Sequence, residues 1–472
     1  MERIERDSLG EKAVPAEAYY GIQTVRALEN YPISGWRPFP ELIRAMVRIK
    51  KCAARVNAEL GLVEESIARA IIAAADDVLA GRFEDQFVVD VFNSGAGVSF
   101  HMNVNEVLAN RANEILGGRR GEYSPVHPND HVNRGQSTND VMPTAMRLAT
   151  LEVARPLLER VEELARALRR KGEAFHDVVK AGRTHLQDAV PVRLGQEFHA
   201  YAHIVEGHAR RLRQAVEELR ILGIGGTAVG TGLNAHPAFR FRVIEELKRE
   251  TGEELIPAED LMAAMQSMAP FVAVSGAMKS FALDLIKICD DLRLMASGPL
   301  AGLAEIELPA LQPGSSIMPG KVNPVMPEML TMVCFQVIGN DMTIALAAAH
   351  GEFELNVMMP VIAFDLLLSA KLLTNALRVF TEKAVVGIHA HAERCRYYAE
   401  SSPALVTALA PRLGYERAAR VARELLLTRK TIRELVQEAG WMSEEELRRA
   451  LDVEAMTEGG LIGSTSEPPS GM

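Results

Sequence analysis

The hydrophobic and polar positions of the chain repeat most clearly between residues 199 and 222. Side chains with an apolar or aromatic character return there at steps of three and four, and charged residues fill the opposite face. The repeat consists of Tyr201, Ile204, Val205, His208, Ala209, Leu212, Ala215, Val216, Leu219 and Leu222. This spacing predicts an amphipathic helix over 199–222. A further helical stretch is expected over 41–60.

Two later stretches are almost free of charge. Residues 261–278 contain no Asp, Glu, Lys or Arg, and residues 329–349 contain only Asp341. Length alone would allow a membrane span. Gln266 and Pro270 within the first stretch, and the acidic pair Glu259–Asp260 before it, argue against one. We therefore expect no membrane contact, and helices that bury their second face in a bundle shared between subunits.

The pattern of helical stretches and turns changes twice along the sequence, which predicts three segments. Residues 1–136 mix helical stretches with turn clusters, and residues 137–396 form long helices, the first capped by Asn139 or Asp140. Residues 397–472 form a small helical domain with a disordered tail. Capping boxes are expected there at Thr431–Glu434 and Ser443–Glu446.

Composition sharpens this picture. Aromatic residues make up only 5% of the chain, which favours a mainly all-α fold. The net charge of −10 excludes bulk attraction to nucleic acid or anionic lipid, so an anionic ligand needs a local positive site. The four cysteines follow no zinc or C-x-x-C spacing, and the first residues lack an apolar signal region. We therefore expect a cytoplasmic protein.

Two patterns suggest cofactor chemistry only superficially. The glycine-rich segment 224–232 has no lysine of a Walker loop and follows a helix rather than a strand, so it is expected to be a tight turn. His199 and His203 have the spacing of two metal ligands on a helix, but no third ligand stands nearby. We expect neither a metal nor a cofactor.

Three polar segments are the strongest candidates for chemistry. Segment 314–324 (Gly-Ser-Ser-Ile-Met-Pro-Gly-Lys-Val-Asn-Pro) combines hydroxyls, a lysine and an amide in a loop that cannot be helical. Such a loop suits a carboxylate, or the extra negative charge that develops on one. Segment 136–140 opens a long helix, whose amides favour anions. Segment 182–188 places a histidine in a polar break between helices.

Together these segments resemble the aspartase/fumarase superfamily, whose members share the Gly-Ser-Ser-x-Met-Pro-x-Lys-x-Asn loop. The similarity extends over nearly the whole chain, from Ala16 to the C-terminal helices. It implies a homotetramer whose three-domain subunits pool their central helices into a twenty-helix bundle. It also implies active sites shared by three subunits, and β-elimination from a small dicarboxylate that usually releases fumarate with an amine or water.

The resemblance assigns roles to individual residues. Ser315 would be the base, which requires donors and positive charge to lower its pKa. His185 and Glu328 would complete the catalytic group, with Glu328 orienting the histidine. The substrate would be bound by Ser137, Thr138, Asn139, Thr184, Lys321, Asn323, Ser99 and His101. Retention of these residues argues against a non-catalytic structural protein on the same scaffold.

Within the superfamily the chain resembles the aspartase branch more than the class II fumarases. The aspartase-like segments are 15–21, 257–261 and 333–341, together with 355–362. The chain departs from its relatives at Val98 and His101, where they carry threonine and asparagine. Val98 cannot hydrogen-bond, so the pocket could suit a substituted aspartate. Deamination of L-aspartate is therefore the expected activity, with a fumarase or a substituted-aspartate lyase as alternatives.

Overall fold

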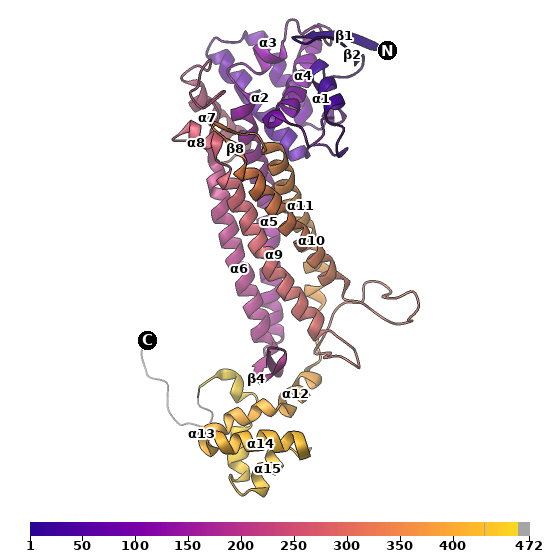
Figure 1. Cartoon of the computed structure of the whole chain (residues 1–472), viewed down its shortest axis with the longest axis vertical. Helices are drawn as coiled ribbons and strands as arrows, with labels where there is room; N and C mark the ends of the chain where they lie inside the picture. Colours follow the sequence, from indigo (N-terminus) through magenta and orange to yellow (C-terminus); the bar gives the residue numbers. More distant parts are fainter. Residues whose placement is uncertain (429, 461–472) are drawn as a thin grey trace. The chain divides into compact units, whose positions relative to one another are not determined.

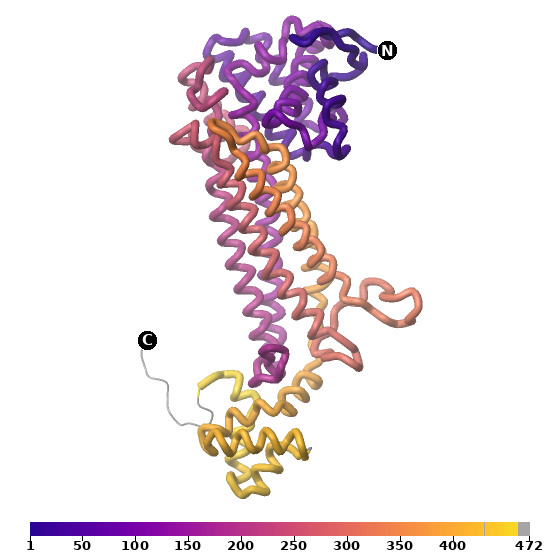
Figure 2. The backbone as a smooth tube through the Cα atoms, viewed as in Figure 1, coloured from indigo at the N-terminus to yellow at the C-terminus, as the bar shows by residue number. Residues whose placement is uncertain are grey.

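The computed structural model describes residues 1–428 and 430–460, whose backbone Figure 2 traces. These residues divide into two compact units. Unit 1 comprises residues 1–160, 208–283 and 332–375. Unit 2 comprises residues 161–207, 284–331 and 376 onward. The limits of these units fall within long helices and not at 136 and 396. The three segments predicted from the sequence therefore remain a prediction.

Unit 1 begins with a hairpin and four helices (Figure 1). The antiparallel strands β1 (Glu2–Asp7) and β2 (Gly10–Pro15) precede α1 (Ile22–Asn30), α2 (Pro40–Glu59), α3 (Glu65–Leu79) and α4 (Val98–Ile115). Helix α2 packs against α3, and buries Leu42, Met46 and Ile49 at helical spacing. The helix expected over 41–60 is thus confirmed within one residue at each end.

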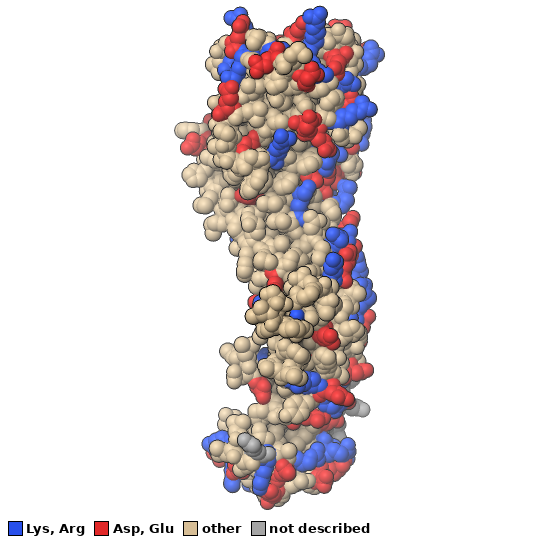
Figure 3. Space-filling view, turned by 90° about the vertical axis from the view of Figure 1, so that its right-hand side faces the viewer, with Lys and Arg blue, Asp and Glu red and all other residues tan. Residues whose placement is uncertain are grey.

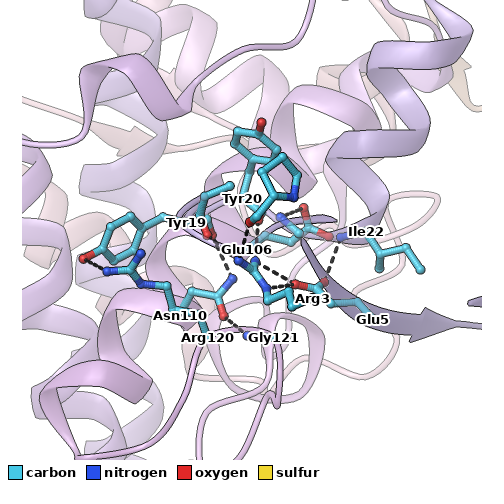
Figure 4. A network of polar contacts seen from close by, with 12 residues as sticks. Arg3, Glu5, Tyr19, Tyr20, Ile22, Glu106, Asn110, Arg120 and Gly121 are labelled. Atoms are coloured by element: carbon cyan, nitrogen blue, oxygen red, sulfur yellow. Dashed lines mark hydrogen bonds and ion pairs between the residues drawn. The ribbon is translucent and has the colours of Figure 1, made fainter. Parts of the chain in front are cut away.

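The N-terminus of α1 is capped from a distance. No side chain of the helix itself caps it. Instead the buried Glu106 of α4 accepts the backbone N–H groups of Gly21, Gln23 and Thr24, at 2.8, 2.8 and 3.1 Å. A Cβ at Gly21 would stand 1.9 Å from the hydroxyl of Tyr123, so only glycine lets the chain pass here. Figure 4 shows this network with Arg3 and Glu5 of β1 beside it.

The long helices of the middle of the chain are α5 (Thr138–Ala174), α6 (Leu194–Glu217), α9 (Ala269–Met295), α10 (Val325–Ala349) and α11 (Met359–Lys383). The helix expected over 199–222 is shifted. Helix α6 starts at Leu194 and ends at Glu217, and a 3₁₀ turn (Glu218–Arg220) follows it. Leu222 belongs instead to β5 (Ile221–Leu222), which pairs in parallel with β6 (Ile256–Pro257). The apolar spacing continues past Glu217, but there the backbone pairs with a strand.

The uncharged stretch 261–278 is also interrupted. It forms α8 (Leu261–Gln266) and the start of α9, and Pro270 occupies the first turn of α9, where a missing N–H is tolerated. Two windows, in α10 and in 359–387, are long and apolar enough to cross a membrane by length and composition alone. Buried helices of globular proteins meet the same criterion. The second window is 61% buried within the chain.

The remaining elements of unit 1 are α7 (Phe239–Thr251) and the hairpin of β8 (Gly351–Glu352) and β9 (Leu355–Asn356). Unit 2 contains the hairpin of β3 (Val179–Thr184) and β4 (Gln187–Arg193), and β7 (Ile306–Glu307) paired with β10 (His389–Ala390). Its short helices are α12 (Ala392–Ser401), α13 (Ala410–Leu413), α14 (Tyr415–Thr428), α15 (Ile432–Glu438) and α16 (Glu444–Ala450).

The end of the chain follows the sequence prediction where the structure describes it. Both capping boxes are confirmed, with Thr431 and Ser443 as the capping residues of α15 and α16. Residues Ala455–Glu458 still form a 3₁₀ turn. The disordered tail expected from Thr457 onward lies, from residue 461, outside the described residues.

Candidate active site

The first group of predicted site residues lies in unit 1, at the start of α5. Ser137 is the capping residue, because its hydroxyl accepts the N–H of Asn139 at 3.2 Å. The carboxylate of Asp140 reaches back to the N–H of Ser137 at 2.9 Å. Asp140 thus binds back to the N–H of the capping residue Ser137, whereas the sequence had suggested Asn139 or Asp140 as the cap. The helix begins at Thr138, and a helix start of this kind favours anions near the predicted substrate residues.

Asp140 also fixes the glycine-rich segment to this helix. Its other oxygen accepts the N–H groups of Gly225 and Thr227, both at 2.9 Å, and Asn139 donates to the carbonyl of Ala228 at 2.8 Å. Burial raises the pKa of Asp140 to about 6, although these N–H donors oppose the shift. The segment forms a turn, as expected, and it holds the start of α5 from one side.

His101 lies next to this group but does not reach solvent. Its side chain is 0% exposed, and both ring nitrogens have partners. Nδ1 lies 2.7 Å from the hydroxyl of Thr138, and Nε2 lies 2.5 Å from Nζ of Lys50. Val98 and Ser99 open α4, and Val98 is 41% exposed. Hence, in the chain itself, Val98 offers an apolar surface while His101 acts on Thr138.

Lys50 of α2 is a residue of this group that the motifs do not mark. It is fully buried, and its ammonium also donates to Asn133 and Gln136, at 2.8 and 2.9 Å. The sequence does contain a sign that Lys50 is buried. Lys50 stands four residues after Met46 and three before Ala53, within the apolar stripe of its helix. Burying a lysine at such a position is costly unless polar groups form hydrogen bonds with it.

The second group is the tip of the β3–β4 hairpin in unit 2. His185 and Leu186 form a two-residue turn between the paired Thr184 and Gln187, with φ of 55° and 59°. Two positive φ values are the signature of a type I′ turn, which usually takes asparagine and glycine. Non-glycine residues held in this conformation are strained, and such strain concentrates at functional sites. The break predicted between helices is therefore a hairpin that presents Thr184 and His185 to solvent.

Buried charges anchor the base of this hairpin. Lys180 of β3 contacts Glu197 of α6 at 2.9 Å and Glu305 at 3.3 Å. Arg183 pairs with Glu305 at 2.9 Å, and the Glu305 side chain is wholly buried. Gly182 lies between these cations, where a Cβ would stand 2.5 Å from the carbonyl oxygen of Val190. These contacts fix the position from which His185 projects.

The third group is the loop before α10, also in unit 2. Its base is closed by two hydrogen bonds of 2.7 Å, from Gly314 N–H to the carbonyl of Lys321 and from the Asn323 amide to the carbonyl of Gly314. The hydroxyl oxygen of Ser315 accepts the N–H groups of Ile317 and Met318, at 3.2 and 3.0 Å. Donors of this kind favour the deprotonated oxygen. The loop therefore supplies part of what a serine base requires.

The other predicted residues of the loop differ in exposure. Lys321 is exposed, Asn323 is half-buried, and Glu328 lies half-buried in the first turn of α10. Figure 1 shows the loop extending away from the helices of its own unit. A lysine on such a loop can approach an anionic ligand without being desolvated beforehand.

Within the described part of unit 2, no hydrogen bond or ion pair joins the hairpin tip at Thr184 and His185 to the loop that carries Ser315. Ser99, His101 and Ser137 to Asn139 form one group, Thr184 and His185 a second, and Ser315 to Glu328 a third. Over all the described residues, no cluster of three or more His, Cys, Asp or Glu side chains could hold a metal ion.

Comparison with known proteins places the chain among lyases. Residues 10–339 match the family described as Lyase, and residues 405–458 match the family described as Fumarase C C-terminus. An aspartate ammonia-lyase of Bacillus subtilis is 48% identical over 461 residues, covering 98% of this chain and 97% of that protein. A class II fumarate hydratase of Thermosynechococcus vestitus is 47% identical over 455 residues, covering 96% and 97%.

Solved structures agree with this comparison. A Brucella melitensis protein described as a fumarate lyase and delta crystallin, bound to cobalt, superposes with a TM-score of 0.93 at 47% identity. The match covers 97% of this chain and 100% of that one. The class II fumarase of Schistosoma mansoni has a TM-score of 0.94 at 37% identity, covering 97% and 99%.

Proposed function

The chain belongs to the aspartase/fumarase superfamily of lyases, and from that premise we propose that it catalyses the reversible deamination of L-aspartate to fumarate and ammonia. The observation that carries the proposal is the loop around Ser315, whose hydroxyl oxygen receives two backbone N–H groups. The names of the similar proteins favour a carbon–nitrogen lyase, since aspartate ammonia-lyases of two Bacillus sources are 49% and 48% identical.

The chemical difficulty of this reaction is the removal of a proton from carbon. Ser315 as alkoxide takes the proton from C3 of aspartate, and the electron pair moves into the neighbouring carboxylate. The resulting aci-carboxylate carries two negative charges. When it collapses, the C2–C3 double bond forms and the C2–N bond breaks, so that the ammonium group leaves as ammonia. Stabilising the doubly charged intermediate is the main task of the protein.

We assign this task to the three groups described above. Lys321 and Asn323 hold the carboxylate that becomes the aci-carboxylate, and Ser137, Thr138 and Asn139 hold the substrate from the start of α5. Thr184 and His185 approach from the hairpin, with Glu328 orienting the histidine. As the resemblance to the aspartase/fumarase superfamily implies, we propose that the complete site is assembled from three subunits of a homotetramer.

The surface of α10 supports the tetramer. Met332, Phe335, Met342 and Leu346 are between 59% and 63% exposed in the single chain. Figure 3 shows a broad area almost free of charged residues on the side where α10 lies. An apolar surface of this extent requires a partner. Asp341 on the same helix is paired with Lys279 and accepts from Ser275, which suits packing against protein rather than lipid. We accordingly place the enzyme in the cytoplasm.

Fumarate formation decides between this function and its alternatives. L-aspartate, L-malate and a set of N-substituted aspartates are offered to the purified enzyme, and the absorbance of fumarate is followed. We expect the highest kcat/KM with L-aspartate. Preference for malate would make the chain a fumarase. Preference for a substituted aspartate would agree with the exposed methyl groups of Val98. No fumarate from any of them would refute the proposed function.

A further inference from the structure

The hydrogen bonds around Lys50 link the proton positions of Lys50, His101 and Thr138 to one another. An ammonium group has three N–H donors, and Nζ of Lys50 has three neighbours that can accept: His101 Nε2, Asn133 Oδ1 and Gln136 Oε1. Among the described residues, no carboxylate forms an ion pair with it. The titratable groups that face it are His101 from α4 and Asp140 from α5. The surroundings therefore satisfy a charged lysine through neutral acceptors.

The short contact between Lys50 and His101 then fixes the imidazole. At 2.5 Å only one proton can lie between Nζ and Nε2. If Lys50 supplies it, the ring is neutral and its own proton sits on Nδ1. That proton points to the hydroxyl oxygen of Thr138, 2.7 Å away. Burial and the charge of Lys50 both hold the pKa of His101 well below its usual value, in agreement with a neutral ring.

The consequence for Thr138 is directional. Its oxygen receives a hydrogen bond from His101, so its own O–H proton is free to point elsewhere as a donor. The opposite arrangement follows if Lys50 is neutral. The imidazole then donates from Nε2 to the amine, Nδ1 accepts the Thr138 proton, and the hydroxyl can no longer donate. The protonation of one buried lysine thus sets the direction of a hydroxyl at the start of α5.

We propose that Lys50 and His101 are positioning residues that fix the Thr138 hydroxyl as a hydrogen-bond donor toward a substrate carboxylate. We call the hydrogen-bonded chain Lys50–His101–Thr138 the relay. The role of a substrate carboxylate rests on the proposed function, whereas the direction of the hydrogen bonds in the relay does not. Burial lowers the pKa of Lys50 well below its usual value, opposed by Asp140. Substrate binding should therefore weaken as the pH rises through the lowered pKa of Lys50, when the lysine loses its proton and the direction of the hydrogen bonds from Lys50 through His101 to Thr138 reverses.

The relay is tested without any substrate by ¹⁵N NMR of sedimented protein labelled at histidine. The His101 signals are identified by their absence in His101→Gln. We expect a neutral His101 that carries its proton on Nδ1, the less common tautomer in water. A proton on Nε2, or a doubly protonated ring, overturns the proposal. This result stands whether or not the enzyme acts on aspartate.

Kinetics test the consequence for binding. His101→Gln keeps one acceptor for Lys50 and one donor for Thr138, so KM should stay within about twofold of wild type, whereas His101→Leu should raise KM about tenfold with a smaller change in kcat. Lys50→Met should raise KM similarly and remove the rise of KM that accompanies the deprotonation of Lys50. Lys51→Met is the matched control, because Lys51 pairs with Asp76 and Glu250 instead.

A double-mutant cycle separates the relay from a general packing effect. If Lys50 acts through Thr138, Lys50→Met should add little to the KM of Thr138→Val. Additive losses, or equal KM values for His101→Gln and His101→Leu, overturn the proposal. Should wild type turn over no dicarboxylate, the proposed function fails, and the NMR measurement alone decides on the relay.

Discussion

A serine hydroxyl must be made acidic before it can take a proton from carbon. At Ser315 the protein uses the backbone for part of this work, through the N–H groups of the second and third residues after it. The loop that brings them there is closed by Gly314, where a Cβ would stand 2.5 Å from the carbonyl oxygen of Lys321. The glycine of the motif therefore has a steric reason, and the geometry around the proposed base Ser315 depends on it.

The role of Ser315 predicts the effect of removing its hydroxyl. Ser315→Ala should lower kcat at least about a thousandfold, because no other group on the loop can accept the C3 proton. The melting temperature and the oligomeric state should stay unchanged, since a small hydroxyl on a loop contributes little to packing. Turnover near that of wild type in a correctly assembled variant would exclude Ser315 as the base.

Val98 predicts a change in specificity. If its methyl groups replace a hydroxyl that would contact a polar leaving group, Val98→Thr should raise kcat/KM for L-aspartate relative to an N-substituted aspartate. A regained hydrogen bond of about 1.4 kcal/mol corresponds to a factor of ten. Wild type and variant are compared on both substrates. An unchanged ratio would make this departure from the relatives neutral.

Residues of the site differ in how far the sequence could predict them. Ser315, Lys321 and Asn323 belong to one contiguous motif, so the resemblance identifies them at once. Lys50 belongs to no motif, and its importance depends on His101 and Asn133, which lie 51 and 83 positions away. Only the fold brings these partners together. An isolated sequence shows merely a lysine on an apolar stripe.

At the scale of elements, the capping of helices shows the same contrast. Helices α15 and α16 are capped by residues within their own first turn, and the sequence predicts both. Helix α1 is capped by Glu106, which lies 85 positions from Gly21. No pattern in the neighbouring sequence predicts this cap. Similarly, His185 and Leu186 are unusual residues for a type I′ turn, so the hairpin of β3 and β4 was predicted as a break between helices.

The Glu106 cap predicts a pH dependence of stability. Burial raises the pKa of Glu106 to about 7 from a usual 4.5, despite its N–H donors. The raised pKa means that the folded protein binds this proton more tightly than the unfolded chain. The resulting stabilisation is complete below pH 4.5 and is lost as the pH rises through 7. It amounts to about 3 kcal/mol at most.

Glu106→Gln tests this dependence, because glutamine is neutral at every pH. The variant should be less stable at pH 5, since it loses one acceptor for the start of α1. Between pH 5 and pH 8, however, its melting temperature should fall less than that of wild type. Thermal unfolding at both pH values measures the difference. Parallel changes in the two proteins would show that Glu106 does not titrate in this range.

At the scale of the whole molecule, the apolar surface of α10 predicts its assembly. Leu346→Glu should dissociate the tetramer and abolish activity, because a charge would be buried between subunits without a partner. The control is Leu426→Glu on α14, where an exposed leucine carries no such expectation. Light scattering and turnover are measured for both. An intact, active tetramer of Leu346→Glu would remove α10 from the interface.

The mainly helical fold could be predicted because long helices leave periodic apolar patterns. The patterns failed where tertiary contacts override them. Leu219 and Leu222 continue the spacing of α6, yet Leu222 pairs with β6 in a short parallel sheet. The uncharged stretch after Asp260 reads as one helix, yet the chain breaks before Pro270 and starts a new helix there. At Leu222 the local preference yields to pairing with β6, whereas the break before Pro270 has a local cause, because a helix tolerates proline in its first turn.

The Glu106 and Tyr123 network also bears on how the chain is made. The hydroxyl of Tyr123 donates to Glu5, although 118 positions separate the two residues. At about 5–20 residues per second, a ribosome needs roughly 6–24 s to lengthen the chain from one to the other. The β1–β2 hairpin can close by itself in microseconds, with Arg3 on the same strand as a partner of Glu5, but the bond from Tyr123 cannot form during that interval. The strand that emerges early must therefore remain undocked until α4 and the segment after it have left the exit tunnel.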